Sequence, residues 1–275
     1  MLLVCEALLV KMASRTIDPR GDKNDLPQRL CPLSCVNQKN IGLVKVLNEN
    51  ASRKLDFVSR KVNEIVELVL QHRLVAILRL PDLTDAIPLV QALLDGGVRL
   101  IEFTLTNPDA GNAVARCRRD IKQFDHGEAA IGIGSVRTVD EAKLALDSGC
   151  QFVVTPIYLP AVIKTCKNAN MMICSGAFTP TEIYNAHLDG SEIVKVFPAR
   201  DLGPNYIKDV LAPMPFLKLM PTGGVDLSNV QSYFDAGAVA VGVGGQFVDR
   251  TAIKNRDWLA ITKAAQQFVQ ATSRP

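Results

Sequence analysis

The sequence predicts an α/β fold, a TIM (β/α)8 barrel, preceded by an N-terminal helix and a poorly ordered N-terminal extension. From about residue 58 onward, eight apolar segments alternate with helical patterns at intervals of roughly 20–25 residues. The apolar segments are hydrophobic throughout, as is typical of parallel strands buried on both faces. A doubly wound open sheet is the alternative, but it requires a dinucleotide fingerprint or an evident switch point. The nearest candidate, Gly242 to Gly245, lacks the third glycine spacing and lies on the last strand.

The predicted elements alternate along the whole barrel. An amphipathic helix at about 59–72 comes first, and several later helices end at glycines, which commonly stop helices: Gly96–Gly97, Gly149, Gly190 and Gly237. The predicted strands are 73–79, 98–105, 129–135, 151–156, 170–176, 193–199, 216–224 and 238–245. The predicted helices that follow them are 83–95, 109–121, 138–148, 160–168, 180–188, 204–211, 226–235 and 255–272.

Composition limits the function classes. A chain of 275 residues with 48% hydrophobic residues can bury a full core. Its net charge is only +3, and the basic residues are dispersed without aromatic residues between them, which argues against a nucleic-acid partner. The seven cysteines are odd in number and mostly flank apolar stretches. This pattern indicates buried free thiols in a reducing compartment, so we expect a cytoplasmic protein.

The first 57 residues are expected to form a flexible extension, with the barrel domain spanning 58–275. No run approaches the roughly 20 apolar residues of a membrane helix, and Glu6 interrupts the apolar N-terminus, so neither a membrane anchor nor a signal peptide is predicted. Acidic residues within 12–57 argue against a transit peptide. Cys31 and Cys35 form the only local cysteine pair, but no second pair accompanies them, so no metal site is predicted there.

Lys195 is the most informative residue, because it is the only cation in the apolar run IVKVFP. On a strand it shares one face with Ile193 and Phe197. Burial penalises the ammonium form and favours a neutral amine, which is a nucleophile toward a ketone or aldehyde. The alternative is an edge lysine whose head group reaches water.

Polar residues at the carboxyl ends of the strands are the other candidates, because active sites of this fold lie there. Arg79 ends the first strand, and Glu102 lies on the second strand on the same face as Leu100. Glu102 and Lys195 would be the only charged pair inside the barrel, with Arg79 at its mouth. We interpret Glu102 as an acid/base, with a structural ion pair to Lys195 as the alternative. Other strand-end candidates are Thr104, Ser135 and Thr155.

Two glycine pairs predict an anion site. Gly223 and Gly224 follow Thr222 at the end of the seventh strand, and Gly244 and Gly245 end the eighth. Their unobstructed backbone amides suit a phosphate or carboxylate at this place in the fold. No cage of carboxylates or imidazoles can be assembled at the strand ends, which favours metal-free imine chemistry without a cofactor.

The combination of motifs resembles the 2-keto-3-deoxy-6-phosphogluconate (KDPG) / 4-hydroxy-2-oxoglutarate (KHG) aldolase family. The resemblance covers about residues 60–270 and rests on RLIEFTLTNPDA, AAIGIGSVRT, CQFVVTP, GAFTPTE, IVKVFPA, LMPTGG and AVGVGG. It implies that Lys195 forms the Schiff base, that Glu102 is the acid/base, and that the subunits form a homotrimer. It further implies phosphate binding by Thr222, Gly223, Gly224, Gly244, Gly245 and Gln246. The residues expected to bind the carboxylate and hydroxyl groups of the substrate are Arg79, Thr104, Thr106, Ser135, Thr155, Pro156 and Phe197.

The chain departs from the family pattern at several positions. Many members carry an arginine four residues after the glutamate, where it grips the substrate carboxylate, and here that residue is Thr106. Arg79 and Ser135 are the candidates to compensate. The family's S-P-G reads Thr155-Pro156-Ile157, Ser175 replaces a common proline, and Gln246 replaces a phosphate-binding serine.

The resemblance implies a class I aldolase that releases pyruvate with glyceraldehyde 3-phosphate or glyoxylate. Because the same imine would also decarboxylate oxaloacetate, decarboxylation is an alternative main activity. A phosphate-binding isomerase or epimerase, and a catalytically idle barrel used for binding, also remain open.

Overall fold

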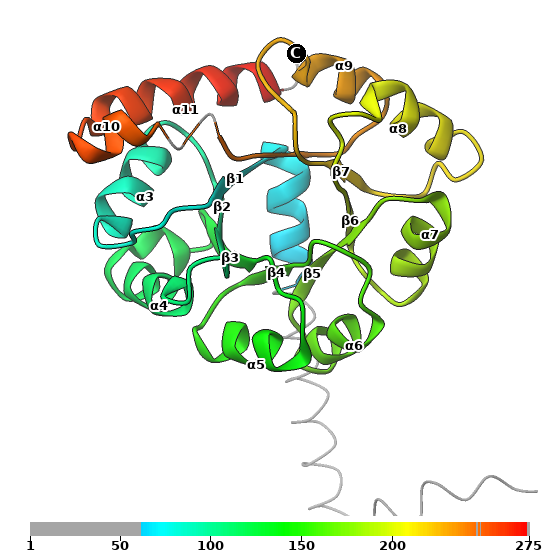
Figure 1. Cartoon of the computed structure of the whole chain (residues 1–275), viewed down its shortest axis with the longest axis horizontal. Coiled ribbons are helices and arrows are strands. Elements are labelled where there is room, and N and C mark those ends of the chain that lie inside the picture. The colour runs from blue at the N-terminus through cyan, green and yellow to red at the C-terminus, as the bar shows by residue number, and fades with distance from the viewer. Residues whose placement is uncertain (1–61, 246, 248, 274–275) are drawn as a thin grey trace, which may run out of the picture. The chain divides into compact units, whose positions relative to one another are not determined.

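The computed structural model describes residues 62–245, 247 and 249–273. Eight parallel strands form an inner ring, and helices surround it (Figure 1). The strand order is β7-β6-β5-β4-β3-β2-β1-β8. A bridge between Thr222 and Gly242, and a 3.0 Å hydrogen bond from the Val239 amide to the Leu219 carbonyl, join β7 to β8. The prediction of a TIM barrel is therefore confirmed, while the expected extension of residues 1–57, Cys31, Cys35 and Gln246 lie outside the described residues.

The elements have the following bounds. The strands are β1 Leu74–Leu78, β2 Leu100–Thr104, β3 Ala130–Gly134, β4 Phe152–Val154, β5 Met172–Ala177, β6 Ile193–Val196, β7 Leu219–Pro221 and β8 Val241–Val243. The helices are 62–72, α3 Ala86–Asp95, α4 Ala110–Asp120, α5 Val139–Asp147, α6 Pro160–Asn168, α7 Pro180–Leu188, α8 Gly203–Leu211, α9 Val230–Asp235, α10 Arg250–Lys254 and α11 Trp258–Thr272. A short 3-10 turn, η2, spans Lys122–Phe124.

Three predicted helices, 83–95, 226–235 and 255–272, begin three or four residues later than expected, and local turn chemistry explains the last two. The predicted helix 226–235 begins only at residue 230, because the Asp226 carboxylate accepts hydrogen bonds from the amide and hydroxyl of Ser228 and holds a turn. The predicted helix 255–272 begins only at Trp258, as α11, and a separate short helix that was not predicted, α10, precedes it at Arg250–Lys254. Arg256 adopts a left-handed φ of 54° between them, and Asp257 caps the second helix.

Apolar side chains form two separate cores. The outer core lies between the strands and the surrounding helices. The inner core fills the barrel with the inward-facing residues Val75, Ile77, Leu100, Ala130, Phe152, Val154, Met172, Cys174, Ile193, Met220 and Ala240. Val66 and Val69 of the helix 62–72, cyan in Figure 1, pack against this inner core. Burying one such valine contributes about 1.5–3 kcal/mol.

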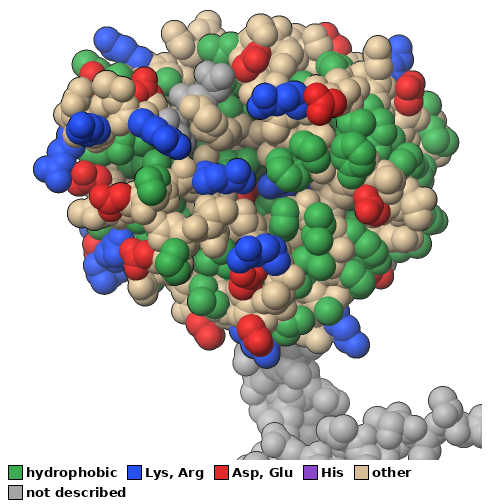
Figure 2. All heavy atoms as spheres, in the orientation of Figure 1, with side chains coloured by type: hydrophobic (Ala, Val, Ile, Leu, Met, Phe, Trp, Pro, Cys, Tyr) green, Lys and Arg blue, Asp and Glu red, His purple; other side chains and the backbone are tan. Residues whose placement is uncertain are grey.

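The described cysteines are free and buried, as predicted. Burial raises the pKa of the Cys117, Cys150 and Cys166 thiols to about 12, so these groups stay protonated near neutral pH. Among the described helices, none is long and apolar enough to cross a membrane. Basic and acidic side chains are interspersed over the face seen in Figure 2.

Candidate active site

Glu102 and Lys195 both lie on the inner face of the barrel. Glu102 shares its face of β2 with Leu100, and Lys195 shares its face of β6 with Ile193, both of which belong to the inner core. Glu102 is fully buried, and Lys195 is 6% exposed. The Lys195 Nζ lies 5.2 Å from the centroid of the Phe197 ring. The barrel therefore brings a carboxylate and an amine into one largely dehydrated interior.

Burial raises the pKa of Glu102, and the nearby charges of Lys195 and Arg79 oppose that rise only in part. Neither carboxylate oxygen of Glu102 has a hydrogen-bond partner among the described residues. A buried carboxylate without partners is costly, so this group is suited to accept a water or substrate proton. A carboxyl group whose pKa is raised by burial holds a proton more readily than an exposed one, which fits an acid/base.

Gly134 makes the space that the Glu102 carboxylate occupies. A Cβ atom added at Gly134 on β3 would lie 1.6 Å from Oε1 of Glu102. Gly132, on the same face, similarly accommodates the ring of Phe152. Neither glycine was among the predicted site residues, although two glycines spaced two residues apart within a strand indicate the close approach of another group.

Thr104 and Thr106 lie together at the carboxyl end of β2. Thr104 is 2% exposed, and its Oγ1 lies 2.7 Å from Oγ1 of Thr106. Arg79, just beyond the end of β1, is exposed. The two threonines are therefore neighbours: Thr106 is exposed to solvent, and its hydroxyl group also contacts that of Thr104.

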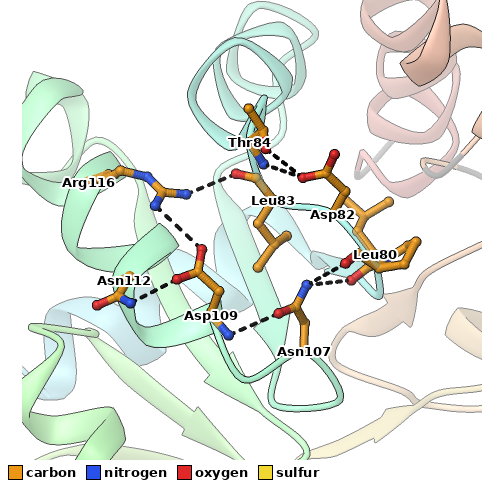
Figure 3. A network of polar contacts seen from close by, with 9 residues as sticks. Leu80, Asp82, Leu83, Thr84, Asn107, Asp109, Asn112 and Arg116 are labelled. Atoms are coloured by element: carbon orange, nitrogen blue, oxygen red, sulfur yellow. Dashed lines mark hydrogen bonds and ion pairs between the residues drawn. The ribbon is translucent and has the colours of Figure 1, made fainter.

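A polar network fixes the loops that carry these residues (Figure 3). Nδ2 of Asn107 donates to the carbonyls of Leu80 and Pro81, at 3.1 and 3.0 Å. Arg116 donates to the Leu83 carbonyl at 2.9 Å. The loop after β2 is therefore tied to the loop after β1, which sets the position of Thr106 relative to Arg79. Sequence reasoning missed Asn107, because its partners are backbone carbonyls that no motif reveals.

Thr155 and Pro156 shape the loop after β4. The Thr155 hydroxyl donates to the Ile157 carbonyl at 2.7 Å and accepts from the Gly176 amide at 2.9 Å. A Cβ atom at Gly176 would lie 2.3 Å from the carbonyl carbon of Pro156. Because Gly176 pairs in register with Lys195, the absence of a side chain there brings the Pro156 backbone close to the lysine strand.

Ser135 occupies a strained position at the end of β3. It is half-buried, and its φ of 59° lies in the left-handed region that residues other than glycine seldom adopt. Such backbone strain concentrates at functional sites.

A cavity of about 820 Å³ lies at the carboxyl ends of β1, β6, β7 and β8. It brings together predicted residues that are far apart in the sequence: Arg79, Phe197, Thr222, Gly223, Gly224, Gly244 and Gly245. It also includes two arginines that the sequence analysis did not identify, Arg200 and Arg250. Glu102 and Lys195 do not line the cavity, but Phe197 connects it to the lysine amine.

The two glycine pairs have different geometries. Gly223 and Gly224 both have φ of 88°, so they form a turn that other residues would strain. The space beside Gly245 is open, since an added Cβ atom would meet nothing within 4 Å. The helices that follow begin several residues later, so the amides at the cavity belong to loops. The described residues contain no group of three or more His, Cys, Asp or Glu that could hold a metal ion.

Comparison with known proteins agrees with this geometry. The sequence model of the KDPG and KHG aldolase family matches residues 65–264. A 2-dehydro-3-deoxy-phosphogluconate aldolase of Treponema pallidum is 33% identical over 207 residues, covering 75% of this chain and 96% of that protein. A 2-dehydro-3-deoxy-6-phosphogalactonate aldolase of Escherichia coli is 32% identical over 204 residues, covering 72% and 96%.

A solved structure adds chemical detail about a relative. The KDPG aldolase of Legionella pneumophila, with pyruvate captured at low pH as a covalent carbinolamine intermediate, matches with a TM-score of 0.64 and 26% identity. The match covers 72% of this chain and 95% of that one. With the barrel, the inner lysine and glutamate and the matched family sequence in agreement, this chain belongs to the KDPG and KHG aldolase family of lyases.

Proposed function

We propose that this protein is a class I aldolase for 2-oxo acids, with Lys195 as the imine-forming amine and Glu102 as the acid/base. The observation that carries the proposal is the unpartnered, fully buried carboxylate of Glu102 beside the nearly buried amine of Lys195. Pyruvate captured as a carbinolamine in the Legionella pneumophila relative supports the same chemistry here.

The reaction runs through a covalent imine. The Lys195 amine attacks the C2 ketone, and Glu102 relays a proton to the oxygen of the carbinolamine, which leaves as water. The protonated imine withdraws the electron pair of the C3–C4 bond, and the C4 hydroxyl loses its proton as the aldehyde departs. The pyruvate enamine then takes a proton at C3, and hydrolysis of the imine releases pyruvate and regenerates the amine.

The proposed substrates are KDPG and KHG, which yield glyceraldehyde 3-phosphate and glyoxylate respectively. Arg79, Thr104, Thr106 and Ser135 are proposed to orient the carboxylate and hydroxyl groups of the substrate. Because the threonine pair already shares a hydrogen bond, Thr106 offers weaker carboxylate binding than an arginine would. Oxaloacetate decarboxylation through the same imine is expected as a side activity.

A substrate panel tests the proposal. Pyruvate release from KDPG, KHG and oxaloacetate is measured side by side, with and without a metal chelator. We expect cleavage of at least one hydroxylated 2-oxo acid to exceed decarboxylation and to be unaffected by the chelator. Decarboxylation alone, or activity that requires an added divalent ion, would contradict the proposal.

Replacing Thr106 with arginine is expected to increase kcat/KM for KDPG by about 10-fold to 100-fold, because an ionic hydrogen bond contributes about 1.5–3 kcal/mol. Steady-state kinetics measure the change. Thr84→Arg is the matched control, since it adds the same charge to the neighbouring loop, where Thr84 bonds only Asp82. An unchanged kcat/KM in Thr106→Arg would indicate that Arg79 already supplies the carboxylate contact.

Replacing Gly134 with alanine is expected to lower kcat by about 100-fold, because the added methyl group occupies the position of the Glu102 carboxylate and misplaced catalytic groups cost about that much. The control is Gly111→Ala on α4, where the methyl group would meet the flexible end of Leu144 at 3.1 Å and Cβ of Ser148 at 3.7 Å. Measuring kcat for pyruvate release by both variants, each shown to be folded, tests this expectation. Full activity in Gly134→Ala would show that the position of Glu102 does not limit turnover.

We further propose a cytoplasmic homotrimer. Exposed apolar side chains near α7 support self-association, with Ile157 at 56%, Phe178 at 44% and Leu188 at 61% exposure. Hydrophobic side chains gather on the α7 side of the face shown in Figure 2. The free buried thiols fit a reducing compartment. Light scattering of the purified chain measures the assembly, and a monomer at micromolar concentration would contradict it.

A further inference from the structure

Three arginines that line the large cavity have no hydrogen-bond or ion-pair partner in the described part of the chain: Arg79, Arg200 and Arg250. The remaining described arginines all have partners. These are Arg73 over the ring of Phe234, Arg99 on the carbonyls of Leu94 and Val98, Arg116 with Asp109, Arg118 with Asp125, Arg119 with Asp120, Arg137 with Glu141, and Arg256 with Asp85. The unpaired guanidinium groups therefore cluster at one place, the cavity.

The backbone at Arg200 is held firmly against the glycine turn. The amide of Ala199 donates to the Thr222 carbonyl at 2.9 Å, and the Tyr233 hydroxyl donates to the Ala199 carbonyl at 3.1 Å. A Cβ atom at Gly224 would lie 2.8 Å from Cβ of Arg200. Arg200 thus packs directly against the glycine turn that lines the cavity.

The guanidinium group of Arg250 is not paired with the neighbouring carboxylate of Asp249, which caps helix α10 instead. The Asp249 carboxylate accepts hydrogen bonds from the amides of Thr251 and Ala252, at 2.8 and 2.9 Å. The acid on the cavity wall, Asp226, is similarly occupied by the amide and hydroxyl of Ser228, and these bonds lower its pKa. Three cations against one carboxylate leave the described cavity wall with an excess of positive charge.

We propose that Arg200 and Arg250 are specificity-determining residues that bind the terminal phosphate of the substrate. This inference rests on the proposed function, and it selects the phosphorylated sugar acid KDPG over KHG. A phosphate monoester carries about −1.5 to −2 charges at neutral pH and accepts paired hydrogen bonds from guanidinium groups, whereas the distal carboxylate of KHG carries only one charge. Two additional arginines beyond the glycine amides match the doubly charged group.

The test compares Arg200→Ala and Arg250→Ala with the unmodified chain on both substrates. We expect kcat/KM for KDPG to fall by about 10-fold to 100-fold in each variant, mainly through KM, because each charged hydrogen-bonding contact is worth that much. The kcat/KM for KHG should change less than about threefold, since KHG has no phosphate group for Arg200 and Arg250 to bind. Lys254→Ala is the matched control, because Lys254 lies on α10 but does not line the cavity.

A binding measurement keeps the inference testable without turnover. Inorganic phosphate is titrated calorimetrically into the unmodified chain, the Lys254→Ala control, and Arg200→Gln and Arg250→Gln, all shown to be folded by thermal unfolding. Weaker phosphate binding in both arginine variants supports the inference. Equal binding in all four proteins, or equal losses on KDPG and KHG, overturns it. Failure of the proposed function would instead appear as absence of pyruvate release from any substrate in the unmodified chain.

Discussion

Replacing Lys195 with arginine is expected to abolish pyruvate release from KDPG, KHG and oxaloacetate together. Arginine retains the positive charge and length, but its guanidinium cannot form an imine with the C2 ketone. Removing the residue that forms the covalent intermediate costs on the order of 10⁴-fold or more in kcat. Coupled assays that detect pyruvate measure the loss on each substrate.

The control is Lys218→Arg, because Lys218 is exposed immediately before β7 and lies outside the barrel interior. It should retain full activity. If Lys195→Arg still cleaved its substrate at more than a trace rate, the imine would have to form elsewhere or not at all, and the assignment of Lys195 would be wrong.

Replacing Glu102 with glutamine is expected to lower kcat by about 10²-fold to 10⁴-fold, the usual contribution of a positioned acid/base. The amide keeps the shape of the side chain within the space left by Gly134 but cannot transfer protons. Rapid-quench measurement of imine formation and of aldehyde release should show both steps slowed. Glu192→Gln is the control, since Glu192 pairs with Lys167 and the Ile173 amide in a structural role.

Glu102→Gln is also expected to change the pH dependence of stability. Burial raises the pKa of Glu102 above its ordinary value of 4.5, so the folded state binds the proton more tightly than the unfolded state. The stability associated with the protonated form is complete below pH 4.5 and is lost as the pH rises through the folded pKa. Thermal unfolding should therefore show the variant gaining stability over the unmodified chain as the pH rises. A gain that is greatest at acidic pH would contradict the burial of an unpartnered carboxylate.

The sequence allowed prediction of those features that follow from strand alternation. Glu102 and Lys195 lie two residues after Leu100 and Ile193 on their strands, so each pair shares one face. The structure places all four side chains inside the barrel. Continuously hydrophobic segments that alternate with helical patterns predicted the fold, because parallel strands covered on both faces typically have that pattern. The roles of individual residues at the site stay predictions that the variants above can test.

Other features depend on contacts between residues distant in the sequence. The space that Gly134 provides for Glu102 is visible only once β2 and β3 pair in register. Arg200 and Arg250 were missed for the same reason, since the chain brings them to one cavity from the loop after β6 and from the start of α10. The break between α10 and α11 depends on the φ of Arg256, which no periodicity reports.

Covalent trapping tests the central claim most directly. The unmodified chain is incubated with pyruvate, reduced with borohydride, digested, and mapped by mass spectrometry beside Lys195→Arg. The account predicts a reduced pyruvate adduct on the peptide containing Lys195 and none on that peptide in the variant. An adduct on a different lysine, or no adduct in folded protein that still releases pyruvate, would contradict it.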